Sequence, residues 1–308
     1  MTRHFLRDDD LSPAEQREVL ELALAFRDDR YVRRPLVGPR AVAVIFDKPT
    51  LRTQVSFCAG IAELGGFPLI IDGNLAQIGL RESIADTARV LGRQVAAVVW
   101  RTGPQTRIEE LAAHAGVPVV NALTDEFHPC QLLADLQTIE EHKGTLAGLT
   151  VAFLGDAASN MSHSFLLAGA TAGMHVRVSG PEGFTPDRAV LARAQEIAGT
   201  TGGSAAGVVD PVEAVTGTDV VVTDTWVSMG KEDEAAERSK PFLPYALDAA
   251  LLEHAHDDAI VMHCLPAYRG KEIAADVIDG PRSVVWDEAE NRLHAQKALL
   301  TWLVEHQP

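Results

Sequence analysis

Basic and hydroxyl side chains gather in one short turn. Thr50-Leu51-Arg52-Thr53 follows the apolar run 41–46 and precedes a helical pattern that begins near residue 55. The N–H groups and the dipole at a helix start favour an anion, and a guanidinium can add two hydrogen bonds to phosphate or carboxylate oxygens. The turn therefore predicts an anion site, although a surface arginine beside a capping threonine would give the same pattern.

Further hydrogen-bond donors lie at the end of a later predicted strand and at the start of a later predicted helix. Arg101 stands at the carboxyl end of the predicted strand 95–100, and His128 and Gln131 lie at the start of a predicted helix. Ligands of doubly wound sheets collect beyond the carboxyl ends of the strands. Arginines, an imidazole and a carboxamide suit a phosphate attached to a carbonyl, because the anion and a developing oxyanion both need fixed donors. One buried histidine would be ordinary, whereas the whole set favours a site.

The second half of the chain predicts a different chemistry. Asn160 closes a turn after an apolar run, Asp224 is followed by Ser228 and Met229, and Cys264 follows a later apolar run. A carboxylate beside small polar groups and a methionine suits an ammonium on an aliphatic chain. This half therefore predicts an amino-acid site, with a helix-capping aspartate and a simply buried cysteine as the plain alternatives.

Other site chemistries fit the sequence less well. The turn at 155–160 lacks the second glycine of G-x-G-x-x-G, which disfavours a dinucleotide site. A zinc site made of His128, Cys130, His263 and Cys264 would not match the usual ligand spacings. A serine or cysteine nucleophile with a histidine base remains an alternative, but no G-x-S-x-G elbow is present.

Two series of strands and helices must position these residues, which predicts an α/β fold of two doubly wound domains with mainly parallel sheets. The capping-box pattern from residue 12 predicts an N-terminal helix of about four turns. We expect a loop at 73–79, and strands at 41–46, 69–71 (buried), 95–100, 117–121, 150–154, 175–179, 207–209, 219–223 and 259–263. We expect helices near 55–64, 83–91, 108–115, 129–141, 160–172, 187–198, 245–255 and 288–305.

Composition limits the class of protein. The 308 residues carry a net charge of −16, which disfavours a nucleic-acid or anionic-membrane surface. The three widely spaced cysteines indicate neither a disulfide framework nor a thiol-rich metal site. The sequence shows no signal-peptide core and no membrane span, so we expect a soluble cytoplasmic protein.

Three motifs together resemble the aspartate/ornithine carbamoyltransferase family. The run H-P-C-Q at 128–131 is similar to the family's H-P-x-Q carbamoyl-phosphate motif. The run D-T-W-V-S-M-G at 224–230 resembles the D-x-x-x-S-M-G loop of the members that use ornithine, and H-C-L-P at 263–266 matches a further family segment. The resemblance extends over nearly the whole chain.

The resemblance implies transfer of the carbamoyl group of carbamoyl phosphate to the δ-amine of L-ornithine, which gives L-citrulline and phosphate in arginine metabolism. It implies a carbamoyl-phosphate domain at 1–143, on which the closing helix 288–305 packs back, and an ornithine domain at 144–287, joined by interdomain helices. It also implies a homotrimer with shared active sites. No metal or organic cofactor is implied, because the leaving phosphate can itself accept a proton.

Roles for single residues follow only from this resemblance. It implies Arg52, Arg101, His128 and Cys264 as catalytic residues. Carbamoyl phosphate would contact Thr50, Leu51, Arg52, Thr53, Arg101, His128, Gln131, Cys264, Leu265 and Arg292, with Gln77 supplied by the neighbouring subunit. Ornithine would contact Asn160, Asp224, Ser228 and Met229.

The chain departs from the family at the anion turn. The usual S-T-R-T-R reads T-L-R-T-Q here, so that Leu51 replaces a hydroxyl and Gln54 replaces an arginine. We therefore expect activity with an altered affinity for carbamoyl phosphate or an altered response to phosphate-mimicking inhibitors. Alternatives are a carbamoyltransferase for another amine, a small-anion binding module without catalysis and, more remotely, a nicotinamide oxidoreductase.

Overall fold

The computed structural model describes residues 2–48, 50–226 and 239–307. The chain divides into two compact units. Unit 1 comprises Met1–Gln137 and Glu290–Pro308, and unit 2 comprises Thr138–Ala289. Each unit contains one parallel sheet with helices on its faces, which confirms the α/β prediction.

The sheet of unit 1 has four parallel strands in the order β2-β1-β3-β4. They are β1 (Ala41–Phe46), β2 (Phe67–Asp72), β3 (Ala97–Arg101) and β4 (Val119–Leu123). The central strands are apolar runs buried on both faces, as expected for a parallel sheet that helices cover. β2 lies at the edge and is largely exposed, so the prediction of a buried strand there is wrong.

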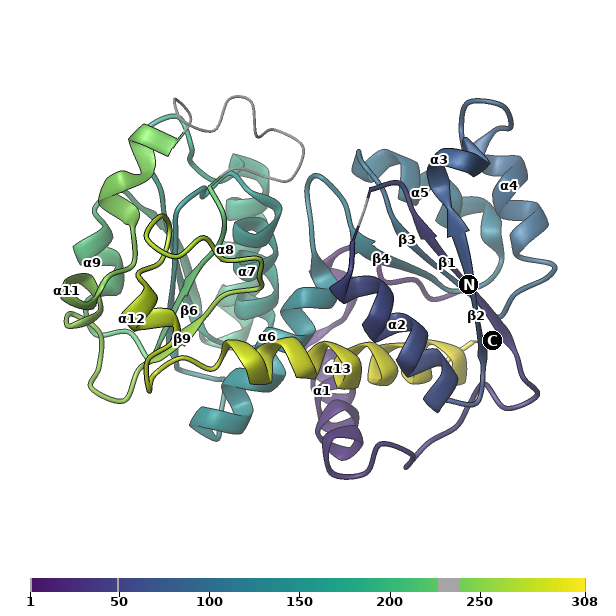
Figure 1. Ribbon diagram of the computed structural model, residues 1–308, viewed down its shortest axis with the longest axis horizontal. Coiled ribbons are helices and arrows are strands. Elements are labelled where there is room, and N and C mark those ends of the chain that lie inside the picture. The colour runs from purple at the N-terminus through teal and green to yellow at the C-terminus, as the bar shows by residue number, and fades with distance from the viewer. Residues whose placement is uncertain (1, 49, 227–238, 308) are drawn as a thin grey trace. The chain divides into compact units, whose positions relative to one another are not determined.

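Helices cover both faces of this sheet. The helical segments of unit 1 are η1 (Asp8–Asp10), α1 (Pro13–Asp28), α2 (Arg52–Glu63), α3 (Gly73–Ala76), α4 (Ile84–Leu91), α5 (Gln105–Ala115), the first part of α6 (Pro129–Lys143) and most of α13 (Val285–Glu305). α4 and α5 bury their apolar faces against β1 and β3, while α1, α2 and α13 gather on the other side of the sheet (Figure 1).

Two sets of polar contacts stabilise helices of unit 1. Ser12 accepts a hydrogen bond from the N–H of Glu15 and the carboxylate of Glu15 accepts one from the N–H of Ser12, so α1 begins with the predicted capping box. Lys297 of α13 pairs with Glu63 at the end of α2, with 2.6 Å between Nζ and Oε2. This buried ion pair ties the C-terminal helix to the element that follows the anion turn.

The sheet of unit 2 has five parallel strands in the order β7-β6-β5-β8-β9. They are β5 (Thr150–Leu154), β6 (His175–Ser179), β7 (Ser204–Val208), β8 (Val220–Thr223) and β9 (Ile260–Met262). α7 (Asn160–Thr171) and α8 (Arg188–Thr201) lie on one face of the sheet (Figure 1). The other face carries α9 (Pro211–Val215), α11 (Ala249–Leu252) and α12 (Ala275–Ile278), and η3 (Lys240–Tyr245) precedes α11 in the chain.

The strand orders place one switch point in each unit. In unit 1 the chain moves outward from β1 to β2 and then returns to the opposite side of β1 with β3. In unit 2 it moves from β5 through β6 to β7 and returns beside β5 with β8. Ligands of open α/β sheets bind in the crevice at such a point, beyond the carboxyl ends of the strands. The anion turn and Asp224 each follow a strand that flanks a switch point.

Two further predicted elements differ from the structure. The expected loop at 73–79 contains the short helix α3, which Asp72 caps by accepting hydrogen bonds from the N–H groups of Asn74 and Leu75. The expected helix 245–255 is divided, because Leu247 pairs with Ile273 in an extended bridge before α11 begins. Among the described helices, none is long and apolar enough to cross a membrane.

Candidate functional site

The anion turn leads directly into α2, which begins at Arg52, earlier than predicted. Leu51 occupies the N-cap position, its side chain makes no capping hydrogen bond, and 74% of its surface is exposed. The first N–H groups of α2 are therefore not claimed by a capping side chain, and the helix start keeps its capacity for an anion. Thr53 is buried, and its Oγ1 accepts a hydrogen bond from Nη2 of Arg292 on α13 at 2.6 Å.

His128 is the buried centre of a cationic group in unit 1. It immediately precedes Pro129, the first residue of α6. Burial, and then the positive charges of Arg292, Arg101 and Arg52, hold the pKa of His128 well below its usual range. The imidazole is therefore neutral at physiological pH and can donate one hydrogen bond to a carbonyl without carrying a charge.

The neighbouring side chains at the start of α6 have structural partners. Gln131 is buried, and its carboxamide donates to Oδ1 of Asp135 at 2.8 Å. The Cys130 thiol donates to the carbonyl of Asn121, and burial raises the pKa of this thiol. Cys130 therefore remains protonated, and a thiolate nucleophile beside His128 is not supported.

The remaining predicted residues of unit 1 are partly exposed. Thr50 is half-buried, and Lys48, just before it, pairs with Asp125 at 3.0 Å between Nζ and Oδ1. Gln77 is half-buried and ends α3 in a left-handed conformation with φ of 49°. The structure thus gathers Arg52, Thr53, Arg101, His128 and Arg292, whereas no contact with them is described for Gln77.

Asp224 follows β8 beside the switch point of unit 2 and has partners on one oxygen. Its Oδ1 accepts from the N–H of Thr225 at 2.7 Å and from the thiol of Cys264 at 3.3 Å. Burial raises the pKa of Asp224, while these hydrogen bonds oppose the rise. Both hydrogen bonds fall on Oδ1, which leaves Oδ2 of this desolvated carboxylate for a cation.

The segment after β9 is held by buried polar groups. His263 has no exposed surface, and its backbone N–H donates to Oε2 of Glu288 at 2.8 Å. The N–H of Leu265 donates to Nδ1 of His263 at 2.9 Å, and Leu265 adopts a left-handed conformation with φ of 58°. Nε2 of His263 lies 3.3 Å from Oε1 of Glu272.

These contacts bear on a possible metal site. Donor atoms of Asp224, His263 and Cys264 all lie within 4.8 Å of one another. Both ring nitrogens of His263 have protein partners, so the imidazole would have to give one up before it could bind a metal ion. The contacts around Asp224 therefore fit an ammonium better than a preformed metal site.

Three predicted ornithine residues remain. Asn160 is the first residue of α7, in the turn that follows β5, and β5 pairs with β8 up to the residue before Asp224. It therefore lies on the expected side of the sheet, although no contact with Asp224 is described. Ser228 and Met229 lie outside the described residues.

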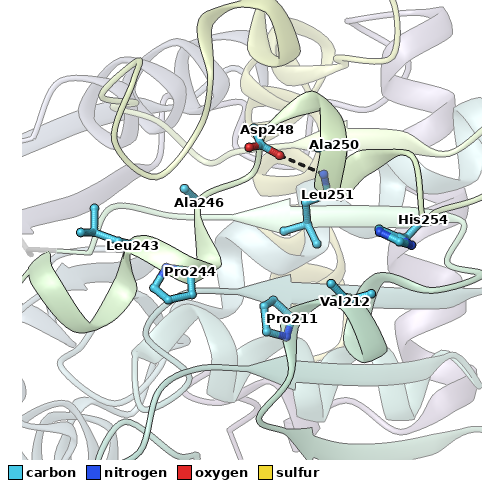
Figure 2. A pocket seen from close by; sticks show the side chains of 9 residues that line it. All are labelled: Pro211, Val212, Leu243, Pro244, Ala246, Asp248, Ala250, Leu251 and His254. Carbon is cyan, nitrogen blue, oxygen red and sulfur yellow. Dashed lines mark hydrogen bonds between the residues drawn. The ribbon is translucent and has the colours of Figure 1, made fainter.

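A surface hollow elsewhere in unit 2 contains none of the predicted residues. Figure 2 shows that its lining is mostly apolar, and that the Asp248 carboxylate accepts a hydrogen bond from the N–H of Leu251 as the cap of α11. The lining residues are Pro211, Val212, Leu243, Pro244, Ala246, Asp248, Ala250, Leu251 and His254. The hollow lacks the convergent donors of the predicted site, so we assign it no role in catalysis.

The sequence did not reveal the residues that support Cys264. His263 lies in the H-C-L-P motif, but the sequence suggested no role for its side chain except in a disfavoured zinc site. Glu272 lies in a charged run typical of an exposed loop. Only the folded chain shows that both side chains are buried and face each other.

Comparisons with known proteins agree with this geometry. Residues 3–141 match the model "Aspartate/ornithine carbamoyltransferase, carbamoyl-P binding domain", and residues 147–303 match the Asp/Orn binding domain of the same family. Ornithine carbamoyltransferase from Clavibacter sepedonicus is 64% identical over 304 residues, which are 99% of each chain. The one from Leifsonia xyli is 62% identical, with 99% of this chain and 97% of that protein covered.

Solved structures give the same result. Ornithine carbamoyltransferase from Pyrococcus furiosus superposes with a TM-score of 0.95 at 46% identity, covering 99% of this chain and 98% of that chain. The enzyme from Campylobacter jejuni, described as anabolic, has a TM-score of 0.91 at 34% identity over the full length of both chains. With two matched domains and a cationic group at the first switch point, this chain belongs to the aspartate/ornithine carbamoyltransferase family.

Proposed function

We propose that this chain transfers the carbamoyl group of carbamoyl phosphate to the δ-amine of L-ornithine, giving L-citrulline and phosphate. The observation that carries the proposal is the concentration of three guanidinium groups around a neutral, buried imidazole at the switch point of unit 1. Such a group stabilises a phosphate and a developing oxyanion together. Unit 1 is the carbamoyl-phosphate domain in this proposal, and unit 2 is the ornithine domain.

Carbamoyl phosphate binds with its phosphate at the start of α2. Thr50, Arg52 and Thr53 with the backbone N–H of Leu51 hold the phosphate oxygens, and Arg101 adds a second guanidinium from the end of β3. The start of α2 supports this assignment, because the side chain of its N-cap residue, Leu51, makes no capping hydrogen bond to the first N–H groups.

The carbonyl end of the substrate binds near the start of α6. His128, Gln131 and Arg292 donate to the carbonyl side of the substrate. The depressed pKa of His128 supports this role, because it keeps the imidazole neutral at neutral pH. The one N–H of a neutral imidazole can donate a hydrogen bond and does not ionise in this range.

Ornithine binds at the ends of β5 and β8. Asp224 accepts from the α-ammonium, Asn160 and Ser228 hold the rest of the amino-acid group, and Met229 packs on the methylenes. Cys264 and Leu265 line the region where the amine meets the carbonyl. An N-acylated ornithine has lost the α-ammonium and putrescine lacks the carboxylate, so either would leave part of this set unpaired.

The reaction is a direct acyl transfer. The neutral δ-amine attacks the carbonyl carbon, a tetrahedral intermediate forms, and the bond to the phosphate oxygen breaks as the carbonyl reforms. The proton lost by the attacking nitrogen passes to the departing phosphate, so the step balances with no redox group or added metal ion.

The enzyme assembles as a homotrimer in which Gln77 reaches the carbamoyl-phosphate site of a neighbouring subunit. Support comes from the edge strand β2, where the side chains of Phe67 and Ile70 are 55% and 50% exposed and Leu69 is also exposed. Further exposed apolar residues nearby in the chain are Val55 on α2, Leu75 on α3 and Leu80 in the turn after α3. An exposed apolar edge of this kind is typical of an interaction surface.

Charge substitution and subunit mixing test this assembly. Ile70→Glu is expected to lower the mass measured by sedimentation equilibrium. Gln77→Ala and Arg101→Ala subunits, each weak alone, are expected to regain activity when they are unfolded together and refolded as mixed trimers. No regained activity in verified mixed trimers would contradict shared sites.

The cytoplasm is the proposed location, and arginine metabolism the proposed role. The three cysteines are all free thiols, as expected in a reducing compartment. Fractionation of the native host would locate the protein.

Steady-state kinetics test the activity itself. Carbamoyl phosphate is supplied with ornithine, acetylornithine, putrescine, lysine or aspartate, and the carbamoylated product and phosphate are both measured. We expect turnover with ornithine and a large loss with each of the others. Preferred turnover of another amine, or binding of carbamoyl phosphate without phosphate release, would overturn the proposal.

A further inference from the structure

We propose that Glu272 is a positioning residue for the ornithine site, acting through His263 on the backbone at Cys264 and Leu265. The inference rests on the proposed function, because Asp224 is taken there as the partner of the ornithine ammonium. Glu272 itself touches neither substrate in this proposal. It acts through a chain of hydrogen bonds that lies entirely within unit 2.

Glu272 is buried, with 1% of its surface exposed. Its Oε1 accepts from the backbone N–H of Tyr268 at 2.5 Å and lies 3.3 Å from Nε2 of the fully buried His263. Burying a carboxylate is costly even when it is paired, and a well-packed apolar pair is often at least as stable. Stability alone therefore does not account for a glutamate at this position.

The hydrogen bonds fix one tautomer of His263. Nδ1 accepts from the N–H of Leu265, so the ring proton must lie on Nε2, where it is donated to Glu272. Glu272 thereby holds the ring in the orientation that lets Nδ1 accept. Glu288 fixes the same residue from the other side by accepting its backbone N–H.

Contacts of Leu265 and Cys264 connect His263 to Asp224. The bond to Nδ1 stabilises Leu265 in a left-handed conformation, which is unfavourable for a residue with a side chain. This conformation directs the preceding residue, Cys264, whose thiol donates to Oδ1 of Asp224. Loss of the Glu272 contact would therefore release the ring, then Leu265, and then the thiol that occupies one oxygen of Asp224.

The test compares variants at Glu272 with a control on the same loop. Glu272→Ala removes Oε1, the acceptor in both contacts, whereas Glu272→Gln retains one oxygen that can accept. The control is Asp279→Asn, because Asp279 pairs with Arg269 of this loop on its exposed side, at 2.7 and 2.8 Å. This control also weakens a carboxylate contact of the loop but does not touch His263.

Kinetics give the first readout. Glu272→Ala is expected to raise KM for ornithine by roughly 10- to 100-fold, as misplacement of a binding group commonly does, and to leave KM for carbamoyl phosphate nearly unchanged. Glu272→Gln should lie between wild type and Glu272→Ala, and Asp279→Asn should match wild type. Equal rises in both KM values, or the same loss in Asp279→Asn, would overturn the proposal.

Substitution of His263 separates its two ring nitrogens. Asn in place of His263 can offer an oxygen near the Nδ1 position but cannot reach Glu272. In the His263→Asn background, Glu272→Ala should therefore raise KM for ornithine little further, because the link that it breaks is already gone. Fully additive effects would show that Glu272 acts by another route.

Alkylation of Cys264 gives a readout that needs no activity. Mass spectrometry of the substrate-free enzyme treated with iodoacetamide should show faster modification of Cys264 in Glu272→Ala than in wild type, with Cys130 unchanged. If wild type forms no citrulline but this change occurs, the proposed function fails and only the link from Glu272 to Cys264 stands. If citrulline forms and neither alkylation nor KM changes in folded Glu272→Ala, the positioning role fails. Should Glu272→Ala not fold, Glu272→Gln and His263→Asn decide by the same measurements.

Discussion

Replacing Asp224 with asparagine should weaken ornithine binding while leaving the fold intact. The variant keeps the shape of the side chain and an oxygen that can accept from the N–H of Thr225, which now bonds to Oδ1 at 2.7 Å. It loses the negative charge that the proposed ammonium contact requires. Carbamoyl phosphate should bind as in wild type, because Asp224 belongs to unit 2 and the cationic group belongs to unit 1.

The size of the effect follows from the contact that is lost. A hydrogen bond to a charged group contributes about 1.5–3 kcal/mol, which corresponds to roughly a 10- to 150-fold rise in KM for ornithine. Although ornithine binding should weaken, the substrate-free protein should not become less stable. Burial raises the folded-state pKa of Asp224 above its unfolded value, so at neutral pH the ionised side chain opposes folding. The free energy of unfolding of substrate-free Asp224→Asn should therefore equal or exceed that of wild type.

Two measurements check both statements. Citrulline formation is followed with one substrate varied while the other is saturating, and unfolding in urea is followed without substrates. Asp224→Ala should raise KM for ornithine at least as much as Asp224→Asn. Asp210→Asn serves as the control, because Asp210 is an exposed cap of α9.

Either of two results would contradict the predictions for Asp224→Asn. Equal rises in KM for both substrates would show that Asp224 is not an ornithine contact. A clear loss of stability in Asp224→Asn would show that its charge supports the fold, contrary to the direction of the pKa shift.

Three further predictions concern unit 1. Thr53→Val should lower the free energy of unfolding by about 1–3 kcal/mol in urea titrations, because the buried hydrogen bond from Nη2 of Arg292 to the Thr53 hydroxyl is lost, whereas Thr53→Ser should not. The pKa of His128 is depressed by burial, so below about pH 6.5 the unfolded chain gains a proton there that the folded protein does not. As the pH is lowered from about 7 to about 5, the free energy of unfolding should therefore decrease less steeply in His128→Gln than in wild type. Parallel slopes over this range would contradict the prediction. Restoring the family residues with Leu51→Thr and Gln54→Arg should change KM for carbamoyl phosphate or inhibition by phosphate mimics, and no change in either would remove the hypothesis about this turn.

Local patterns in the chain were enough to predict most elements. The capping box at Ser12 and Glu15 and the apolar runs of the central strands depend on nearest neighbours in sequence, and the structure confirms them. The prediction of a buried β2 was wrong because the apolar run 69–71 does not show whether its strand lies in the middle of a sheet or at an exposed edge. The expected helix at 245–255 was wrong because the bridge between Leu247 and Ile273 is a contact between distant parts of the sequence.

The sequence by itself also determined the family, and it predicted an anion site at the turn, since both depend on residue types at short spacing. Only the tertiary structure decided that Arg292, 239 positions away in the chain, donates to Thr53, and that burial, with three arginines nearby, depresses the pKa of His128. It also decided that Glu272 is buried against His263. Burial and the partners of a charged side chain are properties of elements packed together, and no local pattern records them.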